Sequence, residues 1–102
     1  MAQETPVADK VEEQLELRVP NMYKVLLHND DTTTVEFVIH ILVRIFHRKM
    51  KDAIDLTQVI HETGIGIAGG PYTKEIAEEK ALETVAAARA NGFPLIATFE
   101  EL

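Results

Sequence analysis

Three short runs of strand-forming residues, separated by runs with helical periodicity, are the feature that most constrains the fold of this chain. The strand-like runs are residues 22–28, 65–68 and 95–99. The first helical run begins near Val35, and the second and third cover about residues 52–63 and 74–90. So few strands can form only one small sheet, and that sheet needs helices on one face to build a core. We therefore predict an α+β fold in which a three-stranded antiparallel sheet packs on three helices in the order β-α-α-β-α-β.

Turn and capping residues indicate where these elements begin and end. Residues 29–32 (Asn-Asp-Asp-Thr) are typical of a turn, and Thr33 with Glu36 fits a capping box at the start of the first helix. Gly64 is the expected stop of the second helix, and we predict a turn at Gly69-Gly70-Pro71. Positive charge favourable to the C-terminus of the first helix comes from Arg44, Arg48 and Lys49.

The net charge and the residue types exclude several classes of function. The 102 residues carry 10 Lys+Arg and 17 Asp+Glu, a formal charge of −7, whereas nucleic-acid binding needs clustered cations. No apolar run approaches the roughly 18 residues that span a bilayer, and the N-terminus lacks the pattern of a secretory signal. The chain has no cysteine, hence no disulfide and no thiolate metal site. We expect a cytoplasmic protein that binds neither nucleic acid nor membrane.

Acidic residues are concentrated at the N-terminus. Residues 1–19 contain few large apolar side chains and two basic residues, Lys10 and Arg18, against five acidic ones. The acidic residues are Glu4, Asp9, Glu12, Glu13 and Glu16. This composition predicts a flexible acidic arm over residues 1–19, followed by a folded domain over residues 20–102.

One polar cluster stands out where the first strand meets the first helix. His28-Asn29-Asp30-Asp31 supplies carboxylate and amide oxygens, which can either form a turn and a helix cap or accept hydrogen bonds from a cationic ligand. The residue types alone leave both interpretations open. His40 and His47 have no nearby acid or cysteine, and His61 is typical of a packed or surface residue. The glycines match no phosphate-binding motif, so we expect no metal site and no cofactor.

Four segments of the chain together resemble the ClpS family, small adaptor proteins of the Clp AAA+ protease. The first runs from Met22 to Thr33 (MYKVLLHNDDTT) and continues into Glu36-Phe37-Val38. The others are Ile60-His61, residues 72–80 (YTKEIAEEK) and residues 94–98 (PLIAT). The resemblance covers residues 20–102 and leaves only the acidic arm outside it.

The resemblance implies a recognition protein with no catalytic activity. Members of the family bind the free N-terminus of substrates that begin with Leu, Phe, Tyr or Trp, the N-degrons of the bacterial N-end rule. They deliver these substrates to the ClpA or ClpC unfoldase for degradation by ClpP, and we expect a monomer. The resemblance also implies that the arm helps to engage the unfoldase during handover.

The resemblance assigns a role to individual residues of this chain. The residues implied to bind the substrate α-amino group are Asn29, Asp30 and His61. Asp31 and Thr33 match positions at the pocket mouth that meet the substrate backbone. The positions implied to line the hydrophobic pocket are Val35, Val38, Thr57, Ile60 and Leu95. Glu75 and Lys80 match positions that dock on the N-domain of the unfoldase.

The chain departs from the family pattern at two places. Val35 stands where many members have a Met, and a shorter, stiffer β-branched side chain predicts a shifted preference for the first substrate residue. Gly69-Gly70-Pro71 is one residue longer than the usual connection.

Two other classes of function remain as alternatives. One is a non-catalytic interaction domain such as the C-terminal domain of a ribosomal stalk protein, although the expected third helix is acidic rather than rich in Lys. The other is a small acid/base hydrolase using Asp30, Asp31 and His61, for which we find no clear nucleophile.

Overall fold

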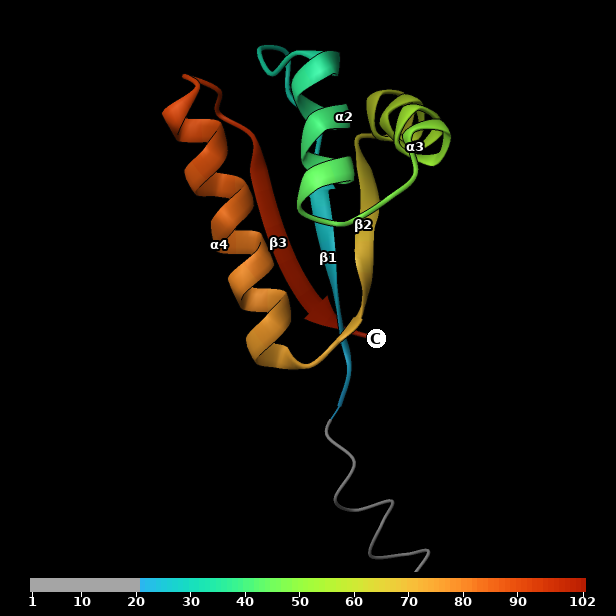
Figure 1. Ribbon diagram of the computed structural model, residues 1–102, viewed down its shortest axis with the longest axis vertical. Coiled ribbons are helices and arrows are strands. Elements are labelled where there is room, and N and C mark those ends of the chain that lie inside the picture. The colour runs from blue at the N-terminus through green and yellow to red at the C-terminus, as the bar shows by residue number, and fades with distance from the viewer. Residues whose placement is uncertain (1–20) are drawn as a thin grey trace, which may run out of the picture.

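The structure, a computed structural model, describes residues 21–102 and has the predicted order of elements (Figure 1). The elements are β1 (Tyr23–His28), α2 (Val35–Arg44), α3 (Met50–Thr63), β2 (Ile65–Tyr72), α4 (Lys74–Ala90) and β3 (Ile96–Glu101). β1 is the central strand of one sheet with the order β2-β1-β3, and both pairings are antiparallel. The prediction of a three-stranded antiparallel sheet with three helices is therefore confirmed.

The core lies between one face of the sheet and the helices. Val25 and Leu27 of β1 are fully buried beneath the helices, because alternate residues of a strand point to the same face. α4 packs along β3 and β1 through small buried residues, among them Ala77, Ala81 and Ala88, which let the helix approach the sheet closely. α3 packs against α2 and β2 (Figure 1). The C-cap of α2 contacts α4, where the Lys80 ammonium donates to the Ile45 carbonyl oxygen. No helix within residues 21–102 is long and apolar enough to cross a membrane.

Both predictions about the first helix need correction. Its N-cap is Thr34, whose hydroxyl accepts a hydrogen bond from the Phe37 N–H at 3.2 Å, so the predicted capping box at Thr33 is wrong. Arg44 lies in the last turn of the helix as predicted, but Arg48 and Lys49 lie beyond it, Lys49 being the N-cap residue of α3. The Arg48 guanidinium instead donates to the main-chain oxygens of Ala68 (2.7 Å) and Ile67, which ties the α2–α3 connection to β2.

The predicted turn at Gly69-Gly70-Pro71 is also wrong, because these residues belong to β2. The register of β2 against β1 shifts at two places, between Tyr23 and Val25 and between Val25 and Leu26. A bulge holds extra residues within a strand without ending it. Pairing with the buried central strand therefore outweighs the local turn signal, and the bulged strand accommodates the longer connection.

Candidate functional site

The turn after β1 is organised by the carboxylate of Asp30. The main-chain N–H groups of Thr32 and Thr33 donate to Asp30 Oδ1 at 2.8 and 2.6 Å, and the Thr33 hydroxyl donates to Oδ2 at 2.7 Å. This local pattern is an Asx-type turn, which directs the chain into the N-terminus of α2. Asp30 thus fixes the geometry of the turn in addition to any role toward a ligand.

Asp30 keeps its negative charge under physiological conditions. Burial by itself would raise the pKa of Asp30, but the hydrogen bonds from Thr33 and Thr32, with the positive charge of Arg89, outweigh that effect. The pKa of Asp30 is consequently lowered from its ordinary value of 3.8. An ionised carboxylate accepts about four hydrogen bonds, and the turn supplies three of them. One acceptor position remains for a cationic donor.

A main-chain hydrogen bond joins this turn to the end of α3. The Asn29 N–H donates to the Gly64 carbonyl oxygen at 2.9 Å. Gly64 caps α3 with a φ of 90°, in the left-handed region that glycine adopts without steric strain. This link brings Asn29 close to the last turn of α3, which carries His61. The side chains of Asn29 and His61 are both exposed and available to a ligand.

A pocket of about 480 Å³ opens between the turn, the start of α2 and the C-terminal half of α3. Its apolar wall is formed by the buried residues Val38, Thr57 and Ile60. The Thr57 hydroxyl is satisfied by the Ala53 carbonyl oxygen at 2.7 Å within α3. Val35, the first residue of α2, is 53% exposed and lies at the rim of the pocket.

The pocket collects nearly all residues that the sequence assigned to substrate recognition. Its lining includes Asn29, Asp30, Asp31, Thr33, Val35, Val38, Thr57, Ile60 and His61. Leu95 does not line it, being 1% exposed within the hydrophobic core. The sequence assignment missed Thr32, Thr34 and Glu36, which also line the pocket. Placing the helix cap at Thr34 rather than Thr33 would have pointed to Thr34.

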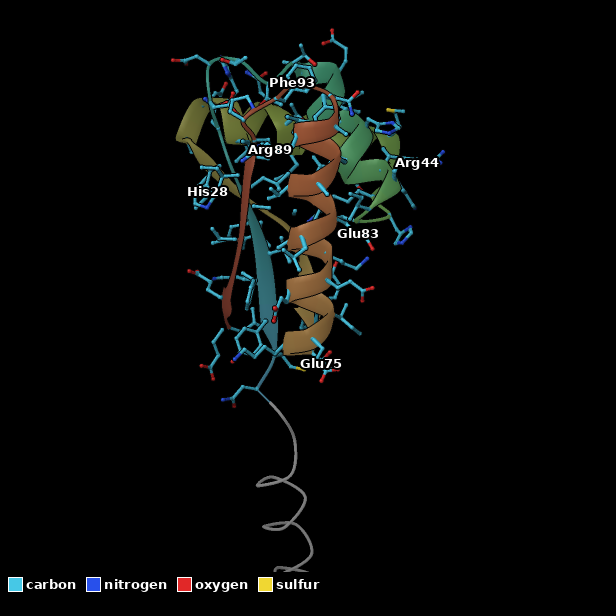
Figure 2. All side chains as sticks on the ribbon, turned by 90° about the vertical axis from the view of Figure 1, so that its left-hand side faces the viewer. His28, Arg44, Glu75, Glu83, Arg89 and Phe93 are labelled. Carbon is cyan, nitrogen blue, oxygen red and sulfur yellow. The ribbon has the colours of Figure 1, made fainter. Side chains whose placement is uncertain are left out.

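The two residues assigned to unfoldase docking have different surroundings. Glu75 is exposed in the first turn of α4, on a shallow acidic surface shared with Glu83 (Figure 2). Lys80 is half-buried, and its Nζ donates to the Ile45 carbonyl oxygen at 2.8 Å, at the C-cap of α2. The ammonium also lies 5.5 Å from the Tyr72 ring centroid. Lys80 therefore ties α4 to the end of α2.

The pocket can hold an ammonium group and an apolar side chain at the same time. Asn29, Asp30 and His61 offer an amide oxygen, a carboxylate and an imidazole around its rim. Charge-assisted hydrogen bonds from an ammonium to such acceptors are about twice as strong as those between neutral groups. Val38 and Ile60 then cover the side chain of the same ligand.

Comparisons with known proteins agree on one family. Residues 18–98 match the family described as "ATP-dependent Clp protease adaptor protein ClpS". The ATP-dependent Clp protease adapter protein ClpS of Lawsonia intracellularis is 48% identical over 87% of this chain and 81% of its own. The protein of the same name from Clostridium acetobutylicum is 41% identical over 100% of both chains.

A solved structure also has this fold. Agrobacterium tumefaciens ClpS2, whose structure is described as bound to L-phenylalaninamide, superposes with a TM-score of 0.78 at 33% sequence identity. The superposition covers 82% of this chain and 100% of the Agrobacterium chain. That ligand combines a free amine with an aromatic side chain.

Proposed function

Because the chain belongs to the ClpS family of Clp protease adaptors, we propose that it binds the free N-terminus of proteins that begin with a bulky hydrophobic residue. The observation that carries this proposal is the single pocket that joins amine acceptors to an apolar wall. The phenylalaninamide bound to the Agrobacterium relative has the same two groups, a free amine and a large side chain.

The amine end of the ligand makes the site selective for chain termini. A free α-amino group has a pKa of about 7.7–8.0 and is mostly cationic at neutral pH. Asp30 offers it a charge and one acceptor position, while Asn29 and His61 supply two more acceptors when the imidazole is neutral. An internal residue has a neutral amide in place of this ammonium and therefore lacks the charge-assisted hydrogen bond to Asp30. Acetylation of the terminus removes the charge and adds bulk.

The apolar wall makes the site selective for the first side chain. Burying a Leu or Phe side chain in an apolar pocket contributes about 1.5–3 kcal/mol relative to leaving it exposed. This difference corresponds to roughly 10- to 150-fold tighter binding than that of a peptide beginning with Ala. We propose Leu, Phe, Tyr and Trp as the preferred first residues.

A peptide series tests this proposal. Fluorescence anisotropy would measure the affinity of matched peptides that begin with Leu, Phe, Tyr, Trp or Ala, each with a free and an acetylated N-terminus. We expect tight binding only of the peptides that have both a free N-terminus and a bulky first residue. Equal affinity for the free Ala and Leu peptides would contradict it.

We further propose that the adaptor delivers its substrates to the ClpA or ClpC unfoldase, docking through the exposed start of α4. Of the two residues assigned to docking, Glu75 faces solvent, whereas the Lys80 ammonium donates to the Ile45 carbonyl oxygen and so ties α4 to the end of α2. A Glu75→Lys variant is expected to lose unfoldase binding while its affinity for the Leu peptide is unchanged. A variant that still delivers substrate at the wild-type rate would exclude this docking site.

The predicted arm over residues 1–19 lies outside the described residues, and its role in handover remains a proposal. The two alternative functions have less support. Family membership favours an adaptor over a ribosomal stalk domain or a hydrolase. The Asp30 carboxylate, one of the three candidate acid/base groups of the hydrolase, is already engaged in organising the turn.

A further inference from the structure

The face of the sheet turned away from α2 and α4 carries exposed isoleucines on both edge strands. Figure 2 shows His28 on the side of the sheet opposite to Arg44 of α2. Residues paired across neighbouring strands point to the same face of a sheet. The register pairs His28 with both Ile65 and Ile96, and it pairs Leu26 with Ile67. Ile65 and Ile96 therefore flank His28, and Ile67 lies beside Leu26, which is 8% exposed.

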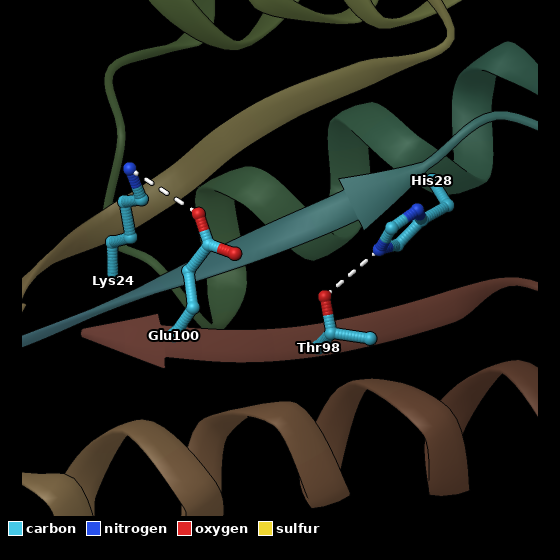
Figure 3. A network of polar contacts seen from close by, with 4 residues as sticks. All are labelled: Lys24, His28, Thr98 and Glu100. Atoms are coloured by element: carbon cyan, nitrogen blue, oxygen red, sulfur yellow. Dashed lines mark hydrogen bonds and ion pairs between the residues drawn. The ribbon is translucent and has the colours of Figure 1, made fainter. Parts of the chain in front are cut away.

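We call this surface the open face, and its isoleucines are well exposed. The open face comprises Lys24, Leu26, His28, Ile65, Ile67, Ile96, Thr98 and Glu100. Ile65, Ile67 and Ile96 are 41%, 48% and 52% exposed. Figure 3 shows the polar residues on the same face, where Lys24 pairs with Glu100 at 3.4 Å and His28 hydrogen-bonds Thr98 at 2.8 Å. Clustered exposed apolar side chains of this kind mark interaction surfaces.

The size of the open face argues against a second copy as its occupant. Three strands spaced about 4.8 Å apart, of six (β1 and β3) and eight (β2) residues at about 3.3 Å per residue, span roughly 300 Å² of planar area. Stable protein interfaces bury about 800 Å² on each partner. The open face thus suits one short segment of chain better than a dimer interface.

The segment before β1 has the position and the pattern to be that occupant. The Met22 carbonyl oxygen accepts a hydrogen bond from the Leu102 N–H, so the chain enters the sheet at the Lys24–Glu100 end of the open face. Apolar residues alternate with charged ones over residues 15–19, Leu-Glu-Leu-Arg-Val. An extended segment with this alternation presents its apolar side chains on one side.

The length of the segment is also sufficient. A layer that packs on a sheet lies about 10 Å above it, and residues 20–22 span about that distance at roughly 3.3 Å per residue. The nine residues 11–19 then extend over roughly 30 Å, which exceeds the length of the six-residue strand β1.

We infer that residues 11–19 pack on the open face of the sheet in the free protein, with Leu15 and Leu17 over the isoleucine cluster. This contact leaves the pocket and the start of α4 uncovered. This role rests on the proposed function: the contact holds the arm against the folded domain until the unfoldase binds the arm.

Cysteine cross-linking of the full chain tests the inference in the absence of peptide and unfoldase. The natural chain has no cysteine, so each variant carries only the introduced pair. Two pairs test the contact: Leu15→Cys or Leu17→Cys, each combined with Ile67→Cys on the edge strand β2 of the open face. The matched control combines the same arm cysteine with Ile76→Cys, which is 43% exposed near the start of α4 on the helical side.

We expect an intramolecular disulfide to form at least about tenfold faster with Ile67→Cys than with Ile76→Cys, because docking raises the local concentration of the arm at the open face. Equal rates for the two pairs would overturn the inference. Disulfide-linked dimers in place of intramolecular bonds would also overturn it and assign the face to a second copy. The readout involves neither peptide nor unfoldase, so a negative result leaves the proposed function standing.

Methyl NMR of the full chain gives a second measurement that needs no change in the folded domain. A Leu15→Ser/Leu17→Ser variant is expected to shift the methyl signals of Ile65, Ile67 and Ile96, and to leave that of Ile76 in place. Unchanged signals on the open face would overturn the inference.

Discussion

The clearest consequence of the site geometry concerns the charge of Asp30. An Asp30→Asn substitution keeps the size of the side chain, and its amide oxygen can still accept from the Thr32 and Thr33 N–H groups. The amide nitrogen would then face the Thr33 hydroxyl, which is able to accept a hydrogen bond. The turn is thus expected to survive while the negative charge toward the ligand is lost.

The magnitude follows from the hydrogen bonds at this carboxylate. Three acceptor positions serve the turn, so one charge-assisted bond to the ligand is lost in Asp30→Asn. A hydrogen bond to a charged group contributes about 1.5–3 kcal/mol, which predicts roughly 10- to 150-fold weaker binding of a Leu peptide.

Fluorescence anisotropy at neutral pH measures this loss directly. The matched control is Asp31→Asn, which removes the same charge from an exposed neighbour that also lines the pocket. We expect the control to change affinity by no more than about threefold, as is usual for an exposed charge. Asp30→Asn binding within threefold of the natural protein would refute the reasoning, as would equal losses in the two variants.

Three further predictions follow from the same structure. Thr33→Val removes the hydroxyl bond to Asp30 and should lower the free energy of unfolding by about 1 kcal/mol at neutral pH. Because the folded-state pKa of Asp30 is lowered, its stabilising contribution is present above its ordinary value of 3.8 and lost as the pH falls through the folded value. Urea denaturation should therefore show the Thr33→Val difference shrinking in acid, and an unchanged difference would contradict this. Val35→Met should change the order of preference among Leu, Phe, Tyr and Trp peptides, since the rim then carries a longer, more flexible side chain; an unaltered ranking would exclude this role. Lys80→Met should lower the free energy of unfolding by about 1–2 kcal/mol through loss of its contacts with Ile45 and the rings, and wild-type stability in urea would show that the bond contributes nothing.

The order of elements could be predicted because its signals are local. The strand-forming residues at 22–28 and the helical spacing from Val35 onward depend on each segment alone. The sequence predictions were wrong where contacts with other parts of the chain determine the local structure. Gly69-Gly70-Pro71 has the composition of a turn, yet pairing with the central strand keeps it in β2. The sequence predicted the helix cap at Thr33, but the Thr33 hydroxyl donates to Asp30, and the neighbouring Thr34 caps α2 instead.

The candidate site was predicted from resemblance rather than from local pattern. The sequence alone left the acidic turn open to a structural or a functional interpretation, and the structure shows that Asp30 has a structural role while keeping one acceptor position for a ligand. The pocket joins that turn to Ile60 and His61, which lie some thirty residues further along the chain. No periodicity in the sequence reports such a contact, and the same is true of the bond from Lys80 to Ile45.

NMR titration with L-phenylalaninamide tests the central claim most directly, with N-acetyl-L-phenylalaninamide as the matched control. The account predicts that the free amine shifts the signals of Asn29, Asp30 and His61 together with those of Val38 and Ile60, and that the acetylated compound shifts none of them at the same concentration. Equal shifts with both compounds, or shifts confined to residues outside the pocket, would contradict it.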